Sequence, residues 1–175
     1  LVAQGPRQHL FYLQAPDDLA DAEQRHPLAR IGHAVSADLR HWQELGQVFG
    51  PDPAPAWDDR CTWTGSILPL PQNLPDSAPP GSRYAMLYTG TNQREGSAIQ
   101  RVGLAWSADL QHWHRHQPSL VLQHPASQSA LTAATSEFDL LGPNPHHADE
   151  QAWRDPDLHY DAQRDVYQAL LSAQL

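Results

Sequence analysis

The chain has 175 residues, and its 20 acidic side chains against 11 arginines and no lysine give a net charge of −9. This acidity argues against nucleic acid or an anionic membrane surface as a partner, and no apolar run is long enough to span a bilayer. The single cysteine, Cys61, excludes an internal disulfide, while 16 prolines and 10 glycines among short apolar runs favour one loop-rich, all-β domain.

The first 50 residues are predicted to form four strands. Residues 1–4 and 9–14 flank a Gly-Pro-Arg turn, residues 31–35 form a buried strand, and residues 44–49 form the fourth. The segment 15–30 between the second and third strands is a polar loop. Its carboxylates are expected to face solvent, as charged loop residues usually do: Asp17, Asp18, Asp21 and Glu23.

One stretch of this unit recurs further along the chain. Residues 31–42 return in register as residues 102–113, with Gly, Ala, Ser-Ala-Asp-Leu and His-Trp in both copies. Ser36 and Asp38, like Ser107 and Asp109, can accept hydrogen bonds from nearby backbone amides and so fix a tight turn. A repeated strand-and-turn element of this kind indicates repeating four-stranded units, which is the pattern of a β-propeller.

The remaining strands follow from this repeat. A second unit has strands at 63–70, 84–90, 102–106 and 119–123, and a third begins with strands at 157–161 and 165–173. The chain is therefore predicted to hold about two and a half four-stranded blades. We expect blade 1 at about 1–50, blade 2 at about 57–123, a loop at 124–152, and the start of blade 3 at about 153–175.

Three short segments contain candidate functional groups. Asp58 and Asp59 precede the innermost strand of the second unit, and Thr64-Gly65-Ser66 offers hydroxyls and a close backbone approach. This pattern suits either a pocket or simply a hydroxyl-rich strand start. In Arg154-Asp155-Pro156, proline restricts the preceding residue to an extended backbone, which would orient Asp155 out of a strand end. That segment suits either a fixed functional carboxylate or a surface ion pair.

The histidines do not predict a metal site. His112, His114 and His116 alternate, and His146 and His147 are adjacent, but zinc sites use characteristic Cys/His spacings that are absent here. Phosphate-binding, dinucleotide-binding and serine-hydrolase motifs are also absent from the sequence. We therefore expect neither a metal nor a cofactor.

Four motifs together resemble one enzyme family, and they span nearly the whole chain. They are His-Leu-Phe-Tyr at 9–12, Gly-His-Ala-Val-Ser-x-Asp-Leu-x-His-Trp at 32–42, Trp-Thr-Gly-Ser at 63–66 and Arg-Asp-Pro at 154–156. In this combination the chain resembles glycoside hydrolase family 32, which includes invertases, levanases and inulinases. The resemblance implies a five-bladed β-propeller, incomplete in these 175 residues, whose substrate is a sucrose-like sugar or an oligosaccharide.

The resemblance also implies roles for individual residues. Asp155 would stabilise the transition state by bonding sugar hydroxyls, with Arg154 beside it, and Trp63 and Thr64 would line the sugar site. The family's nucleophile would precede Leu1 and its general acid would follow Leu175, so the chain alone is expected to be inactive. Leu13 stands where the family has Gln, with Gln14 one place on.

The implied reaction is hydrolysis of a terminal furanoside with retention, β-fructofuranosides first. Retaining glycosidases need two carboxylates about 5–5.5 Å apart. Two alternatives remain at this point: an inverting arabinofuranosidase or xylosidase of the related family 43, and a propeller that binds carbohydrate without cleaving it.

Overall fold

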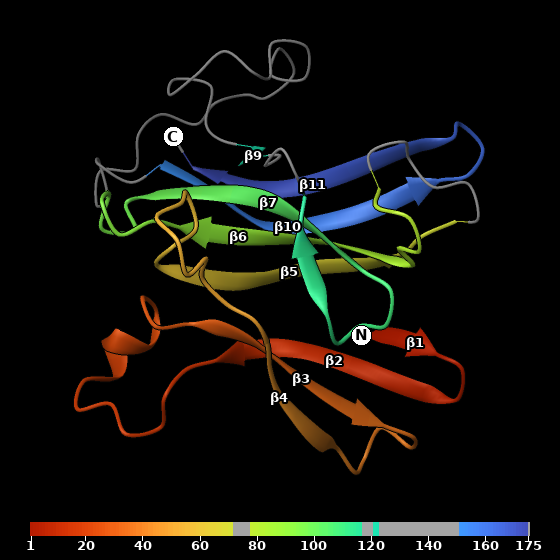
Figure 1. Cartoon of the computed structure of the whole chain (residues 1–175), viewed down its shortest axis with the longest axis horizontal. Coiled ribbons are helices and arrows are strands. Elements are labelled where there is room, and N and C mark those ends of the chain that lie inside the picture. Colours follow the sequence, from red (N-terminus) through yellow and green to blue (C-terminus); the bar gives the residue numbers. More distant parts are fainter. Residues whose placement is uncertain (72–77, 117–120, 123–150, 175) are drawn as a thin grey trace.

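The computed structural model describes residues 1–71, 78–116, 121–122 and 151–174. In these residues the chain forms strands joined by loops, with a single short 3₁₀ helix, η1 (Ala22–Arg25) (Figure 1). The strands are β1 (Val2–Gln4), β2 (Arg7–Gln14), β3 (Arg30–Ser36), β4 (Gln43–Phe49), β5 (Cys61–Pro69), β6 (Tyr84–Thr91), β7 (Ile99–Ser107), β8 (Trp113–Arg115), β9 (Val121–Leu122), β10 (Gln151–Asp161) and β11 (Val166–Gln174).

The first four strands form one antiparallel sheet in the order β1-β2-β3-β4, as the sequence predicts. The strand β3 is buried along most of its length because it lies in the middle of this sheet and faces the second sheet. Gly32 on β3 lies under the ring of Tyr12, where a Cβ would come within 2.7 Å of the tyrosine Cζ. Gly103 lies under Tyr88 in the same way at 2.8 Å, so the repeat extends to this cross-strand contact.

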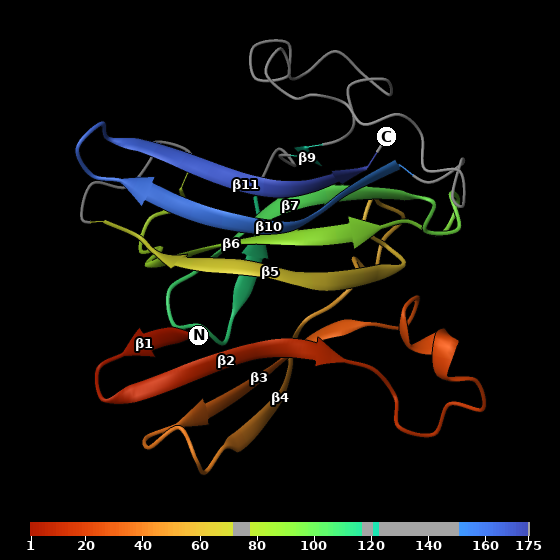
Figure 2. The same ribbon diagram turned by 180° about the vertical axis from the view of Figure 1, so that it is seen from behind.

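The second sheet contains the remaining strands. Its order is β11-β10-β7-β6-β5, with the short strands β8 and β9 both paired to β7 (Figures 1 and 2). The sequence predicted one fourth strand for this unit at 119–123, whereas two short strands share the edge of β7. Because β10 also pairs with β7 in parallel through Gln151 and Ala152, the second and third units form one hydrogen-bonded sheet. The division into blades therefore stays a prediction.

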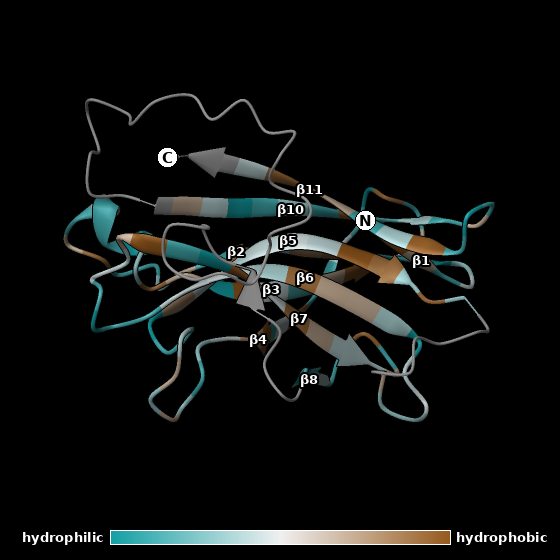
Figure 3. Cartoon of the chain, turned by 90° about the horizontal axis from the view of Figure 1, so that it is seen from above, coloured by the Kyte–Doolittle hydropathy of each residue, from teal (hydrophilic) through white to brown (hydrophobic). Residues whose placement is uncertain are grey.

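The core lies where the two sheets meet. Ile31 and Phe49 of the first sheet pack with Met86, Tyr88 and Ala105 of the second, and all five are at most 4% exposed. Burial of such side chains is the main source of stability that holds one sheet on the other. Figure 3, which colours the chain by hydropathy, shows brown hydrophobic stretches on the strands while the connecting loops are mostly teal.

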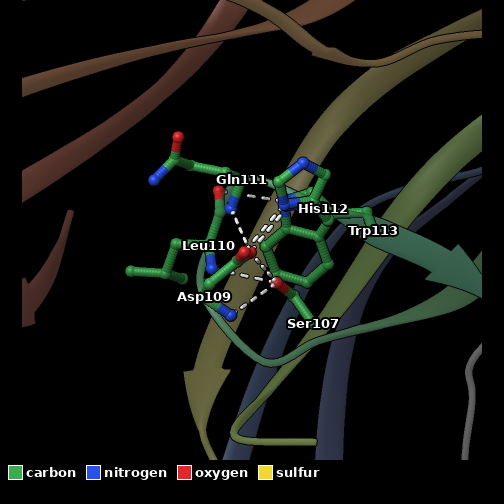
Figure 4. A network of polar contacts seen from close by, with 6 residues as sticks. All are labelled: Ser107, Asp109, Leu110, Gln111, His112 and Trp113. Carbon is green, nitrogen blue, oxygen red and sulfur yellow. Dashed lines mark hydrogen bonds and ion pairs between the residues drawn. The ribbon is translucent and has the colours of Figure 1, made fainter.

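The two Ser-Ala-Asp-Leu turns follow β3 and β7 and have the same internal hydrogen bonds. In the second turn the Ser107 hydroxyl accepts the backbone N–H groups of Asp109 and Leu110 at 3.2 and 2.9 Å (Figure 4). The Asp109 carboxylate then accepts the N–H groups of Gln111 and His112, each at 2.8 Å. Ser36 and Asp38 make the equivalent bonds in the first turn, so the predicted turn chemistry is confirmed in both copies.

Within the described ranges, no helix has the length and apolar character that crossing a membrane would require.

Candidate functional site

A cavity of about 640 Å³ opens where the first sheet's longest loop meets β5 and β10 of the second sheet. All four site residues predicted from the sequence line it: Trp63, Thr64, Arg154 and Asp155. They come from β5 and β10, which are neighbours in space although some ninety residues separate them in the chain. We call this hollow the Asp155 cavity.

Two β-bulges shape the wall of the Asp155 cavity. On β5, the two residues Thr64 and Gly65 lie opposite one residue of β6, because the pairing shifts between Trp63 and Ser66. On β10, the pairing with β11 shifts in the same way between Arg154 and Asp157, so that Asp155 and Pro156 form the bulge. A bulge bends its strand and changes the direction of a side chain, and bulges are over-represented beside active sites.

The two bulges pack against each other. A Cβ added to Gly65 would collide with the Leu87 carbonyl oxygen and would lie 2.6 Å from Cγ of Pro156. The close approach predicted for this glycine is therefore to the neighbouring backbone and to a proline ring. Gly65 lets β10 come close enough to β5 for Asp155 to reach the same cavity as Thr64.

Asp155 differs from its predicted conformation. Proline was expected to hold it extended at the end of a strand, but it lies inside β10 with a φ of +53°, in the left-handed region. The β-bulge is the physical reason, since the extra residue must turn the chain locally. Its carboxylate lies 3.5 Å from Nε of Arg154, and the two side chains are 62% and 40% exposed. A non-glycine residue held at positive φ is strained, and such strain clusters at functional sites.

Trp63 is fixed by the loop of the first sheet. Its indole N–H donates to the backbone carbonyl of His26 at 3.1 Å. One residue earlier on β5, the backbone N–H of Thr62 donates to the carbonyl of Ala29 at 3.2 Å. The indole N–H is therefore used within the protein, and the ring of Trp63 is what it presents to the cavity. The hydroxyl of Thr64 has no partner among the described residues and can bond to a ligand.

The loop between β2 and β3 forms the opposite wall, a role that its sequence does not predict. Its four carboxylates are exposed, as predicted. The loop nevertheless also lines the Asp155 cavity through Asp17, Leu19, Arg25 and His26. Asp21 caps η1 by accepting the N–H of Glu23 at 3.0 Å, which explains one of the loop's carboxylates structurally. The loop's place at the cavity could not be predicted from its own residues, because it depends on the loop leaving β2 at the end of the sheet where Trp63 lies.

Leu13 and Gln14 both line the cavity at the end of β2. Leu13 is 54% exposed, and the Gln14 side-chain oxygen is buried without a hydrogen-bond partner among the described residues. The one-residue displacement of Gln relative to the family pattern therefore leaves both residues at the cavity, with an apolar side chain where an amide was expected.

Asp58 and Asp59 have structural roles and do not line the Asp155 cavity. Asp58 is fully buried, where it accepts from the Tyr88 hydroxyl and from Nε of Arg115, each at 2.8 Å. Burial, followed by the Asp58 charge, raises the pKa of Tyr88. Asp59 accepts the backbone N–H of Gln93 at 2.8 Å and so ties the connecting segment to the loop after β6.

The histidines considered for a metal site go to separate partners. His112 contacts Asp109 in the second turn, and Nδ1 of His116 accepts from the Trp106 indole at 2.9 Å. His146 and His147 lie outside the described residues.

Comparison with known proteins identifies relatives of this chain. Residues 2–175 match the model of the glycosyl hydrolases family 32 N-terminal domain. Beta-fructofuranosidase 1 of Zea mays is 33% identical over 120 residues, which is 67% of this chain and 16% of that protein. Fructan 6-exohydrolase of Beta vulgaris is 35% identical over 86 residues, covering 49% of this chain and 12% of the relative. The chain thus spans about a sixth or less of these relatives.

A solved structure has the same fold. Fructan 1-exohydrolase IIa from Cichorium intybus aligns with 95% of this chain and 25% of its own, at a TM-score of 0.57 and 24% identity. The predicted fold class, an all-β propeller that is incomplete here, is confirmed by this likeness and by the two sheets of the described residues, which do not close into a ring.

Proposed function

The chain belongs to glycosyl hydrolases family 32, and from this premise we propose that its protein hydrolyses terminal β-fructofuranosidic bonds with retention of configuration. The named relatives are fructofuranosidases and fructan exohydrolases, which supports a fructosyl substrate such as sucrose or a fructan. We propose that the Asp155 cavity receives the terminal sugar.

One observation carries this proposal. Two bulges on different strands direct Thr64 and Asp155 into a single cavity, with Trp63 and Arg154 beside them. A concave site with an aromatic ring and a few convergent polar groups is the usual form of a small-molecule site. The volume of about 640 Å³ lies within the common range for such sites.

In this proposal each side chain has a defined task. Asp155 accepts hydrogen bonds from sugar hydroxyls, and these bonds strengthen as positive charge develops on the sugar in the transition state. Arg154, 3.5 Å away, orients the carboxylate. The ring of Trp63 packs against the apolar face of the sugar, and the Thr64 hydroxyl bonds a further sugar oxygen.

The two carboxylates that make and break bonds are proposed to come from the rest of the protein. A retaining glycosidase needs one carboxylate that attacks the anomeric carbon and a second that protonates the leaving oxygen, about 5–5.5 Å apart. We assign neither role to a residue of this chain, and we expect the 175 residues alone to lack hydrolytic activity.

The test compares Asp155→Asn with the wild type in the full-length protein. Assays on sucrose, inulin and levan should show kcat lowered by about 10²- to 10³-fold, the usual cost of removing a group that stabilises a transition state. Carbon-13 NMR of the first fructose released should show the substrate's β configuration at C2, the anomeric carbon. Aryl arabinofuranosides should not be cleaved.

Asp157→Asn is the matched control, because Asp157 is an exposed carboxylate on the same strand, outside the cavity lining. It should leave kcat unchanged. An Asp155→Asn protein as active as wild type would overturn the role given to this residue, and an inverted product would overturn the mechanism.

A further inference from the structure

Two backbone N–H groups, one in the bulge of β10 and one just after it, donate to hydroxyls of the second unit. The N–H of Asp155 donates to Oγ1 of Thr89 at 3.2 Å, and the N–H of Leu158 donates to Oγ of Ser66 at 2.5 Å. Pro156 has no N–H, so the bulge requires no acceptor there. Both acceptors lie on other strands, β6 and β5, more than sixty residues away in the chain.

Thr89 is well placed to hold Asp155 firmly. It is fully buried, and it lies opposite Trp63 in the pairing of β5 with β6. A buried hydroxyl has little freedom to move, and an N–H left without an acceptor in such a place costs free energy. The residue that lies beside the cavity's aromatic ring is thus also the one that fixes the backbone of the cavity's carboxylate.

Asp155 needs such support because its own conformation is unfavourable. Its φ of +53° is in a region that non-glycine residues seldom adopt, and its side chain is 62% exposed, so packing does little to fix it. Proline at 156 adds a further restriction on the Asp155 backbone. Without the acceptor on β6, the strain at Asp155 would be relieved by a local shift of the bulge.

We propose that Thr89 is a positioning residue: its hydroxyl holds the strained Asp155 backbone so that the carboxylate points into the cavity, with Ser66 securing the far end of the bulge. Neither residue lines the Asp155 cavity. The inference rests on the proposed function of Asp155. It adds a buried threonine on β6 to the residues on which the site depends.

The test uses Thr89→Val, which keeps the shape of the side chain and removes the acceptor, in the full-length protein. We expect kcat for sucrose to fall about ten- to a hundredfold, because displacement of a catalytic group by about 1 Å has effects of this size. KM should change less than about threefold, and Thr89→Ser, which restores the hydroxyl, should recover most of kcat.

Thr91→Val is the matched control for stability. Thr91 lies on the same strand and is equally buried. Its hydroxyl, however, bonds Cys61 and Ser97, each at 3.0 Å, and not the backbone of Asp155. It should lower the melting temperature to a degree similar to Thr89→Val while leaving kcat unchanged. If both variants lower kcat equally, the effect of Thr89 is only structural and the proposal fails.

A double variant separates this inference from the proposed function. If Thr89 acts through Asp155, Thr89→Val should lower kcat no further once Asp155 is Asn, because residues acting as a unit are non-additive. If the double variant loses kcat by the product of the two single losses, the role of Thr89 is overturned while that of Asp155 stays intact. If Asp155→Asn itself leaves kcat unchanged, the role proposed for Asp155 is wrong, and the role of Thr89 that depends on it is wrong as well.

Discussion

The two Ser-Ala-Asp-Leu turns have the same internal structure but opposite surroundings. In both, the serine hydroxyl and the aspartate carboxylate accept the same backbone N–H groups, at distances that agree within 0.1 Å. The leucine of each turn has a positive φ, +62° at Leu39 and +69° at Leu110. Yet Leu39 is 55% exposed, whereas Leu110 is fully buried.

The difference arises from position in the fold. Leu110 packs with Val2 of the first sheet and Tyr84 of the second, so the second turn joins the two sheets, with Phe11, Ile67 and Trp113 around it. The first turn, between β3 and β4, lies at the outer side of the first sheet, away from this contact (Figure 1). The turn therefore forms from its own residues, and tertiary contacts then decide whether its leucine contributes to stability.

The largest expected difference in stability between the two turns comes from truncating their leucines. Leu110→Ala should lower the free energy of unfolding by about 2–5 kcal/mol, as buried leucine truncations do. Leu39→Ala, with the same substitution at the same backbone angle, should stay within about 0.5 kcal/mol. Urea unfolding of the two variants measures both, and equal losses would show that burial of the turn is not the deciding difference.

A second difference between the copies is a buried histidine pair. His33 on β3 and His9 on β2 lie 2.8 Å apart between Nε2 and Nδ1. The equivalent positions of the second copy, by strand pairing, are Leu104 and Ala85. Burial, together with the charge of His9, lowers the pKa of His33 from 6.5 to about 4. Burial, and then the charge of Arg7, also lowers the pKa of His9.

This pair should make the protein sensitive to acid. As pH falls from 6.5 to about 4, the unfolded chain binds a proton that folded His33 does not, so stability present above pH 6.5 is progressively lost. Two and a half pKa units correspond to roughly 3 kcal/mol. Replacing both residues by those of the second copy, His9→Ala with His33→Leu, should remove this slope from urea midpoints measured between pH 7 and 4. An unchanged slope would contradict the assignment.

The fold could be predicted because its information is local. Strand pattern and turn chemistry are contained within a few residues, and the turns at Ser36 and Ser107 form as their serine and aspartate side chains dictate. The site residues Trp63, Thr64, Arg154 and Asp155 could be named from motifs, and they share one cavity, although their roles stay proposals.

What could not be predicted depends on contacts between distant segments. The left-handed conformation of Asp155 opposes the local preference before proline, and its backbone N–H donates to a hydroxyl on β6. The wall formed by the loop containing His26 depends on its contact with Trp63, and the burial of Asp58 depends on Arg115. None of these pairings has a signal in the residues next to it.

The smallest expected effect concerns the aspartates of the two turns. The pKa of Asp38 lies well below its usual value because the backbone N–H of His41, then its side chain and the N–H of Arg40, donate to the carboxylate. At Asp109 burial acts in the opposite direction, but the N–H and side chain of His112 still hold the pKa well below its usual value. The stability that each aspartate contributes is present above pH 4 and is lost below it, at a lower pH than the loss due to His33.

At pH 7, Asp38→Asn and Asp109→Asn should each lower the urea midpoint slightly and by similar amounts, less than Leu110→Ala does. A clearly larger loss at Asp109 would mean that the surroundings of the turn, and not its own hydrogen bonds, determine its strength.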